Sequence, residues 1–506
     1  MSSCQDEPWV PPHGSPSRFP LSKSRYLSGL QCYKQLYLDV RSPRLARPAD
    51  EQLVALLEMG TQIGELARAG FPSGILVDAE SVGIQGAIAR TSELMADPNV
   101  PAVFEGMFAF QEVRLRVDVL ERAAEGRWRL IEVKSSTQAK EDHLDDVAIQ
   151  AYVLTGAGIS LERSKLMHIN NQYVYPGGDL DLGHLFLRQD VTPEVAARQT
   201  EIPGRLAAMR EMLTAPSAPA IEPDHHCFEP YECPFWDYCT QAKPARWVFY
   251  LPGGRRTYQE LTSQGVQTID EIPEGFRLTG IQQRMKGNVE WIGPGLKEAL
   301  HGVRYPVHHL DFETFMPAIP RYPNTRPYQT IPFQWSNHIV SGDGQMRHEK
   351  YLCSDPKDPR EEFALTLLES IGRDGTICVY SGYEARILRE LADAFPRLKP
   401  DLDRAIERFW DLLSVIRAYY YHPELKGSFS IKSVLPAAVP GLGYDDLEIQ
   451  EGSMASLQYY RMIFEVSDEE ERAKLRTALL RYCERDTLAM VELRKALVVK
   501  ADKWLL

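Results

Sequence analysis

The sequence predicts an α/β protein with more than one domain, and three observations lead to that prediction. The chain has 506 residues, too many for one ordinary hydrophobic core, so two or three domains are expected. Alternating apolar and polar residues, typical of strands, occur at 113–120 and 128–133. Apolar residues at helical spacing occur at 21–40, 145–155 and 475–497.

The composition is that of a globular protein, with 44% hydrophobic and 25% charged residues. No run of about 18 apolar residues occurs, and the N-terminus lacks the apolar core of a signal peptide. We therefore expect a cytoplasmic protein that does not cross a membrane. Residues 1–20 are rich in Pro and Ser and are expected to form a loose tail. The net charge of −13 argues against a protein that coats duplex by bulk positive charge, but it is compatible with a carboxylate site beside a local basic groove.

The first half of the chain is expected to open with two helices. Residues 21–40 form the first, with Ser22 or Ser24 as its N-cap, and residues 51–69 form the second. The strands at 113–120 and 128–133 follow, and they carry the polar residues of interest.

Asp118 lies on the first of these strands, and Glu132 and Lys134 lie two apart on the next, so that they share a face. Two such carboxylates can hold Mg²⁺ or Mn²⁺, which activates water for attack on a phosphodiester. Lys134 can position that water or offset developing charge. Gln150, on the following helix, and Glu65 are further candidates. The simpler interpretation is a surface salt bridge on an edge strand.

The eight cysteines fall into two groups. Four are scattered and are expected to pack as small hydrophobic residues: Cys4, Cys353, Cys378 and Cys483. The other four combine one upstream residue with a C-x5-C-x5-C series: Cys32, Cys227, Cys233 and Cys239. In a reducing compartment, clustered cysteines are more often metal ligands than disulfides. Their spacing is wider than in most zinc sites and fits an iron–sulfur cluster. Zinc and plain buried thiols are the alternatives, and His225 and His226 are interpreted as loop residues.

Several segments together resemble the RecB-type PD-(D/E)xK nucleases of the CRISPR-adaptation class. They are LSKSRYLSGLQCYKQLYLDV, RVDVL, IEVKSS, DVAIQAYVL and the cysteine series, within about residues 20–245. The resemblance implies a restriction-endonuclease-like fold, metal ligands at Asp118 and Glu132, catalytic roles for Lys134 and Gln150, and a [4Fe–4S] cluster on the four clustered cysteines. The cluster would tie the first helix to the last segment of the domain. A motif histidine of the family is replaced in GTQIGELA, where Gly64 and Glu65 stand.

Residues 246–300 contain short helical patterns broken by Gly and Pro. We expect a packed interdomain connector. The alternative is a small helical module that binds phosphate at helix N-termini.

The second half is expected to contain a mixed sheet. A short apolar strand at 305–310 leads into two acids, and antiparallel strands are expected at 333–340 and 347–352. A buried strand at 375–381 then leads into a helix.

Acids from three of these elements are expected to converge. Asp311 and Glu313 share a face, Glu384 begins the middle helix, and Tyr482 and Asp486 lie four apart on the last helix. Such acids can hold two divalent ions that clamp a phosphodiester, and Tyr482 can orient the attacking water.

This pattern resembles the DEDD exonucleases of the ribonuclease H-like fold, in the subclass defined by Y-x3-D. The residues matching the first and third motifs are Asp311, Glu313, Tyr482 and Asp486. Glu384 stands where the middle motif normally has Asp, and Asp411 is a reserve candidate, although a helix cap is the favoured interpretation of it. RPYQTIPFQWS, YYYHPELKGSFSIKSVLP and LLRYCERDTLAM also resemble an uncharacterised bacterial family that joins both nuclease domains in one chain.

Lys426 and Lys432 could contact phosphates, and the tyrosines at 419–421 could stack on unpaired bases. The alternative for the tyrosines is a helix end packed on the core.

The resulting prediction is a metal-dependent nuclease with two sites, acting on DNA, with single strands favoured and RNA left open. Its pathway would be repair, processing or defence, with a helicase or other factor as an unidentified partner. The alternative is a non-catalytic iron–sulfur subunit that binds DNA within a larger complex. The expected domains are a tail, the first nuclease domain, a connector and the second nuclease domain, at 1–20, 21–245, 246–300 and 301–506.

Overall fold

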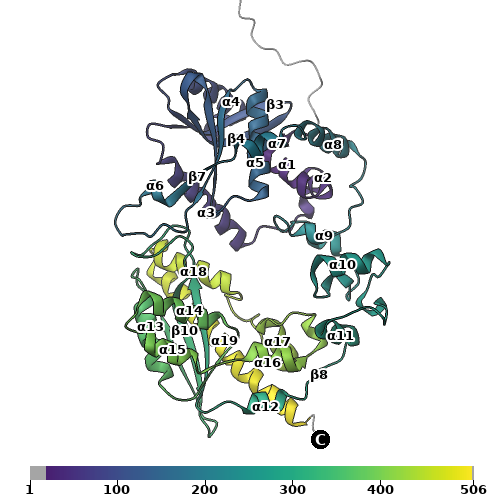
Figure 1. Cartoon of the computed structure of the whole chain (residues 1–506), viewed down its shortest axis with the longest axis vertical. Helices are drawn as coiled ribbons and strands as arrows, with labels where there is room; N and C mark the ends of the chain where they lie inside the picture. Colours follow the sequence, from purple (N-terminus) through teal and green to yellow (C-terminus); the bar gives the residue numbers. More distant parts are fainter. Residues whose placement is uncertain (1–18, 504–506) are drawn as a thin grey trace, which may run out of the picture. The chain divides into compact units, whose positions relative to one another are not determined.

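The computed structural model describes residues 19–503, a mixed α/β protein that divides into two compact units (Figure 1). Most of the expected tail, and Cys4 with it, lies outside the described residues. The first unit comprises residues 1–48, 57–170 and 180–241, and the second comprises 49–56, 171–179 and 242–506. The residues expected to form a connector thus belong to the second unit. None of the described helices has the length and apolar character needed to span a membrane.

The first unit is built on a seven-stranded sheet in the order β2-β3-β4-β5-β6-β7, with β1 paired to β4. The strands are β1 (Leu21–Ser22), β2 (Ile75–Leu76), β3 (Ala102–Phe110), β4 (Val113–Arg122), β5 (Trp128–Lys134), β6 (Leu161–Ile169) and β7 (Phe186–Asp190). β5 runs parallel to β6 and antiparallel to β4. The strands predicted at 113–120 and 128–133 are confirmed as β4 and β5.

The helices of this part of the chain are α1 (Lys23–Gln31), α2 (Tyr33–Arg41), α3 (Glu51–Arg68), α4 (Ala79–Ala96), α5 (Glu141–Gly156), α6 (Leu182–Leu185), α7 (Thr192–Arg198), α8 (Ile202–Thr214) and α9 (Trp236–Thr240). The single helix predicted over 21–40 is wrong, because Cys32 interrupts it. Its backbone is extended, with φ −160° and ψ 121°, although its N–H still bonds to Ser28 O and ends α1. A one-residue break preserves the apolar periodicity, so the pattern could not reveal it. Ser22 caps α1, as predicted, by accepting a hydrogen bond from Arg25 N.

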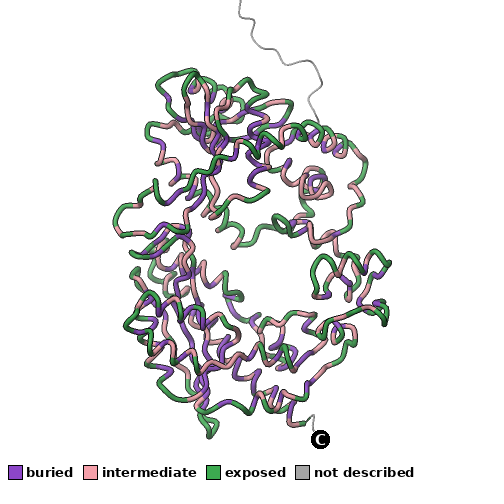
Figure 2. Tube along the Cα trace, in the orientation of Figure 1, coloured by how far each residue is buried: buried purple, intermediate pink, exposed green. Residues whose placement is uncertain are grey.

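Helix α5 packs against four strands of the sheet, from β3 to β6. Its apolar residues, such as Val147 and Val153, are fully buried against strand residues such as Val117 and Leu130. Figure 2 shows the buried residues following the strands of this unit. The sheet and α5 therefore hold the polar side chains between them on a rigid support.

The second unit contains a five-stranded mixed sheet in the order β11-β10-β9-β12-β13. The strands are β9 (Val307–Phe315), β10 (Ile331–Val340), β11 (Met346–Leu352), β12 (Thr376–Val379) and β13 (Phe409–Asp411). β10 is antiparallel to β11, as the sequence predicts, and also to β9, whereas β12 is parallel to β9 and β13. A separate ribbon pairs β8 (Trp291–Ile292) with β14 (Tyr420–Tyr421).

The helices of the second unit are α10 (Gly254–Ser263), α11 (Gly280–Gly287), α12 (Leu296–His301), α13 (Arg360–Ile371), α14 (Tyr383–Ala394), α15 (Lys399–Ile406), α16 (Leu412–Tyr419), α17 (Ile431–Ala438), α18 (Gly452–Phe464) and α19 (Glu469–Lys503). The 35-residue helix α19 packs on β9 and β10. Short 3-10 turns complete the chain: η1 (Pro43–Leu45), η2 (Ala124–Gly126), η3 (His225–Cys227), η4 (Val248–Tyr250), η5 (Ile269–Glu271) and η6 (Pro423–Leu425). The long contact between α19 and β9 places residues of the two elements opposite one another.

Candidate active sites

The acids predicted in the second half of the chain line one pocket of about 330 Å³. β9 supplies two of them, α14 one, and α19 one acid and a tyrosine: Asp311, Glu313, Glu384, Asp486 and Tyr482. Asp311 and Glu313 alternate along β9 and therefore project on the same face of the sheet. The predicted convergence of three separate elements is thus present in the structure.

These carboxylates are buried together and have little positive charge near them. Burial, followed by the repulsion of neighbouring acids, raises the pKa of Asp311 and Glu313 well above the ordinary range. Burial raises the pKa of Glu384 to about 8 and that of Asp486 to about 6. The Oε2 atom of Glu384 is buried without a hydrogen-bond partner. Oxygen donors with uncompensated charge are the donor set that Mg²⁺ and Mn²⁺ prefer, so the residues fit such ions.

Lys432 is the one cation among the described residues that line this pocket. Its Nζ lies 5.2 Å from the ring centre of Tyr482 and 5.3 Å from that of Tyr444. Tyr444 in turn donates a hydrogen bond of 2.5 Å to Asp486 Oδ1. The sequence suggested Lys432 only as a general phosphate contact, and it gave no signal for Tyr444, which belongs to no recognised motif.

The structure also places two further residues of this unit, Asp411 and Cys483. Asp411 accepts a hydrogen bond from Ser414 N and caps α16, in agreement with the favoured interpretation, and it does not line the pocket. Cys483, expected to be an isolated buried thiol, lies with its Sγ 3.7 Å from Asp311 Oδ2. Its position one residue after Tyr482 places it against β9, on the same helix as the site.

The tyrosines at 419–421 do not form an open stacking surface. Tyr420 and Tyr421 are 0% and 1% exposed and pair with β8, so the packing interpretation is correct for both. Lys426 is exposed and is not among the residues that line the pocket. Residues 331–336 of RPYQTIPFQWS belong to the buried strand β10.

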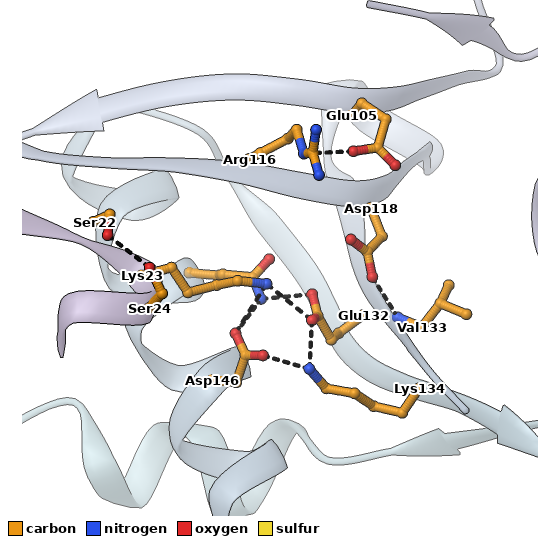
Figure 3. Close-up of polar contacts among 11 residues, drawn as sticks. Ser22, Lys23, Ser24, Glu105, Arg116, Asp118, Glu132, Val133, Lys134 and Asp146 are labelled. Carbon is orange, nitrogen blue, oxygen red and sulfur yellow. Dashed lines mark hydrogen bonds and ion pairs between the residues drawn. The ribbon is translucent and has the colours of Figure 1, made fainter. Parts of the chain in front are cut away.

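The acids predicted in the first unit also meet, between the sheet and α5 (Figure 3). Asp118 Oδ2 accepts a hydrogen bond of 2.8 Å from Val133 N. Lys134 Nζ lies 2.8 Å from Glu132 Oε1, and Gln150 Nε2 donates to Glu132 Oε2 at 2.7 Å. Lys134 and Gln150 thus both contact Glu132, and Asp118 is held beside them by the backbone of β5.

Two residues of this cluster were not predicted. Asp146, on α5, lies 2.5 Å from Lys134 Nζ and accepts a hydrogen bond of 2.9 Å from Gln150. It stands one helical turn before Gln150, and an acid within a buried helical face is a signal that could have revealed it. Lys23, at the start of α1, lies 2.9 Å from Glu132 Oε1 and 3.2 Å from Asp146 Oδ1. No local pattern could have revealed Lys23, which is 109 positions away from Glu132.

Two lysines offset part of the negative charge in this cluster. Burial acts to raise the pKa of Glu132, but Lys134 and Lys23 outweigh it and hold that pKa well below the ordinary range. Burial, together with the Glu132 charge, raises the pKa of Asp118 to about 7. The pKa of Asp146 is also raised, with burial as the largest cause.

Asp118, Glu132 and Lys134 open onto a pocket of about 610 Å³. Glu65 lines it too, with Arg68 Nη2 3.8 Å from its carboxylate. So do Glu105 and Arg116, which form an ion pair of 2.6 Å (Figure 3). Glu105 has φ +55° at an irregularity in the β3–β4 pairing. Oxygen donors and basic residues thus meet in one open pocket, which suits a divalent ion and a phosphate.

The four clustered cysteines, Cys32, Cys227, Cys233 and Cys239, are brought together around one small pocket, as the sequence predicts. Burial raises the pKa of Cys227 and Cys239, and that of Cys233 to about 12. Among the described residues, ligand atoms of three or more side chains lie within 4.8 Å of one another in two places, at Asp311–Glu313–Cys483 and His338–His348–Glu484, and neither is this cysteine group. His226, expected in a loop, lines the pocket from η3, with Nε2 3.6 Å from Cys227 Sγ.

Comparisons with known proteins identify one domain. Residues 308–430 match the family described as "Domain of unknown function (DUF2779)", in line with the resemblance to an uncharacterised family. The matched segment includes Asp311, Glu313 and Glu384 and ends before Tyr482.

A curated relative and a solved structure add little to this. The relative is "Uncharacterized protein UU173" of Ureaplasma parvum serovar 3, 27% identical over 209 residues, which are 36% of this chain and 30% of that protein. The chain therefore spans less than a third of the relative's length. The crystal structure of SSO0001 aligns with 40% of this chain and 88% of its own, at 11% identity and a TM-score of 0.16, too low to assign a fold.

Proposed function

We propose that this protein is a metal-dependent nuclease with two separate sites that hydrolyse phosphodiester bonds, most readily in single-stranded DNA. One observation carries the proposal: buried acids from β9, α14 and α19 share one pocket with a single lysine as counter-charge. Buried carboxylates without compensation are costly unless they coordinate a metal. A purely structural role would not require this arrangement.

The second site supports a ribonuclease H-like exonuclease of the tyrosine subclass. Asp311, Glu313 and Asp486 would hold Mg²⁺ or Mn²⁺, with Glu384 in the place of the usual aspartate. When bound, such ions supply positive charge to the scissile phosphate and lower the pKa of an attacking water. Tyr482, which is 4% exposed and faces the same pocket, would orient that water.

The first site supports a PD-(D/E)xK nuclease. Asp118 and Glu132 would hold the divalent ion, and Gln150 keeps the carboxylate of Glu132 in place through its hydrogen bond of 2.7 Å. Lys134 reaches the open pocket and would neutralise charge on the phosphate or position the water.

A [4Fe–4S] cluster on the four cysteines is part of the proposal. Tetrahedral zinc with Zn–S bonds of about 2.3 Å places its sulfur ligands only about 4 Å apart. No three of the four cysteine sulfurs lie within 4.8 Å of one another. Their spacing is therefore wider than a single zinc ion requires, which supports an iron–sulfur cluster. The cluster would join the α1–α2 junction at Cys32 to the segment that contains Cys227 and Cys239.

The alternative is a non-catalytic iron–sulfur subunit that binds nucleic acid within a repair or defence complex, with a helicase as a candidate partner. Glu384 in place of aspartate favours it, as does the internal charge balance around Glu132. No contact in either pocket distinguishes a ribose from a deoxyribose, so RNA is tested together with DNA.

The test is a nuclease assay on protein purified without oxygen, with end-labelled single-stranded DNA, duplex DNA and RNA, and with Mn²⁺ or EDTA. Wild type is compared with Lys134→Ala, Asp311→Asn and the double variant, and with the exposed control Asp403→Asn. We expect each single variant to lose one product pattern, the double variant to be inactive and the control to be unaffected. Wild-type protein that binds DNA without cutting it would support the subunit alternative.

A further inference from the structure

Lys23 joins two buried acids at the first site. Its Nζ lies 2.9 Å from Glu132 Oε1 and 3.2 Å from Asp146 Oδ1 (Figure 3). Lys134 contacts the same two carboxylates at 2.8 Å and 2.5 Å. Both ammonium groups therefore share one oxygen, Glu132 Oε1, while Gln150 occupies the other.

The local fold holds Lys23 in this position. The residue before it, Ser22, caps α1, and Leu21 pairs with Val113 at the edge of β4. Leu21 and Tyr26, on either side of Lys23 in the sequence, are each 1% exposed. The chain is thus anchored immediately before and after Lys23, so holding its ammonium at the acids requires ordering of the side chain but no further ordering of the backbone.

This contact differs from an ordinary surface ion pair. The side chains of Glu132 and Asp146 are 2% and 4% exposed, so removal of Lys23 would leave them buried with less compensation. Arg25, on the same helix, makes the ordinary kind of pair: it lies 3.2 Å from Asp39, and the two side chains are 33% and 45% exposed. Such exposed pairs contribute little, which makes Arg25 a matched control.

The net charge of the cluster shows how Lys23 affects the binding of a metal ion. Three acids, Asp118, Glu132 and Asp146, face two lysines, which leaves one negative charge when all the acids are ionised. With Lys23 present, a bound divalent ion would change the net charge of the cluster from negative to positive. Without Lys23, the same ion would bring the net charge of the cluster to zero. A ligand that occupies the same carboxylate lowers the affinity of its competitor.

We propose that Lys23 is an internal counter-ion that competes with the divalent cation for Glu132 and so sets the metal affinity of the first site. This inference rests on the proposed metal-dependent function of that site. Lys23 does not line the open pocket, so it acts through Glu132 and Asp146 and is a positioning residue. It also stands at one end of α1, whose other end leads directly to Cys32.

The test measures Mn²⁺ binding, from the EPR signal of the free ion, in the full-length protein. Asp311→Asn and Asp486→Asn are present throughout, so that the second site does not contribute. On that background we compare the parent protein, in which Lys23 is intact, with Lys23→Met, the charge-retaining Lys23→Arg and the control Arg25→Gln. We expect Lys23→Met to bind Mn²⁺ about tenfold more tightly, and Lys23→Arg and Arg25→Gln to bind it as the parent does.

Lys23→Gln supplies the same comparison if Lys23→Met does not fold. Unchanged affinity in the neutral variants would overturn the inference, and so would weaker binding, because a merely structural lysine would damage the site. If neither the parent nor any variant bound Mn²⁺, the metal-dependent function of the first site would itself be wrong. The parent titration therefore separates the two failures.

Discussion

The two acid clusters of this protein are built alike but balanced differently. The first combines acids of β4 and β5 with residues of α5, and the second combines acids of β9 with residues of α14 and α19. At the first, Lys23 and Lys134 pair directly with Glu132 and Asp146. At the second, Lys432 is the one lining cation, and it contacts tyrosine rings and Gln450 O.

This difference in counter-ions indicates which site depends on a bound metal for its stability. The first carries its own counter-ions, so its acids can be buried without a metal. The second has Lys432, but among the described residues no ion pair joins it to the acids, and burial with the repulsion of neighbouring acids raises the pKa of Asp311 and Glu313 well above the ordinary range. We infer that divalent ions bind more tightly at the second site and stabilise its unit more.

The largest effect is expected from the four clustered cysteines, which lie in the first unit. Cys233→Ala should remove the brown colour of a cluster and leave the first unit insoluble or protease-sensitive, since formation of a cofactor site is coupled to folding. Visible absorption and limited proteolysis check this. Cys353→Ala, a buried cysteine of the other unit, should retain the colour. A stable, colourless Cys233→Ala protein with full activity would remove the structural role.

Asp486→Asn should cost the second site at least about 100-fold in rate, because it removes a metal ligand. The same change should leave the products of the first site intact. Kinetics on 3′-end-labelled single strands measure it. The exposed Asp403→Asn, whose carboxylate pairs with Lys399 at 3.3 Å, is the control. Equal losses at both sites would show that the two are not independent.

Lys134→Arg should lower the rate of the first site by about 100-fold even though the charge is retained. A planar guanidinium cannot both pair with Glu132 and Asp146, at 2.8 Å and 2.5 Å, and present its charge to the open pocket as the Lys134 ammonium does; Lys23 does not line that pocket. The assay is made in the Asp311→Asn background, with the exposed Lys140→Arg as control. A rate close to that of wild type would mean that only charge matters at this position.

The smallest expected effect is a pH dependence of the stability of the second unit. The pKa of Glu384 is raised in the folded protein to about 8 from 4.5. Ionisation of Glu384 in the folded protein therefore lowers the free energy of unfolding. This loss is absent below pH 4.5, grows as the pH rises, and is complete above about pH 8. Without metal, the free energy of unfolding should fall by a few kcal/mol, on the order of 2, between pH 5 and 8.

Urea melts at three pH values, in EDTA and in Mn²⁺, measure this dependence. Glu384→Gln should make the profile in EDTA less steep, because an amide does not titrate, and Mn²⁺ should flatten it for the wild type. A second unit that becomes more stable with rising pH in EDTA would contradict the assigned burial of these acids.

Local patterns predicted much of this architecture. The strands carrying Asp118 and Glu132 and the helix carrying Tyr482 and Asp486 follow from periodicity, which reports the buried face directly. Their convergence follows from where motif residues stand on strands and helices. The sequence could not indicate which cations would approach the acids.

What the sequence missed depends on contacts between distant residues. Lys23 reaches Glu132 across 109 positions, and Tyr444 reaches Asp486 across 42. The break at Cys32 escaped because one extended residue does not disturb the apolar stripe on either side. Tyr420 and Tyr421 were ambiguous because burial of a tyrosine is set by the strand that pairs with it, and that strand, β8, is far away in the sequence.

The most direct test of the difference between the two sites is a Mn²⁺ titration, followed by EPR, of the wild-type protein, Asp118→Asn and Asp311→Asn. We predict two classes of binding: a tight class that is lost in Asp311→Asn, and a weaker class that is lost in Asp118→Asn. A single class that survives Asp311→Asn, or a tight class that depends on Asp118, would contradict the account.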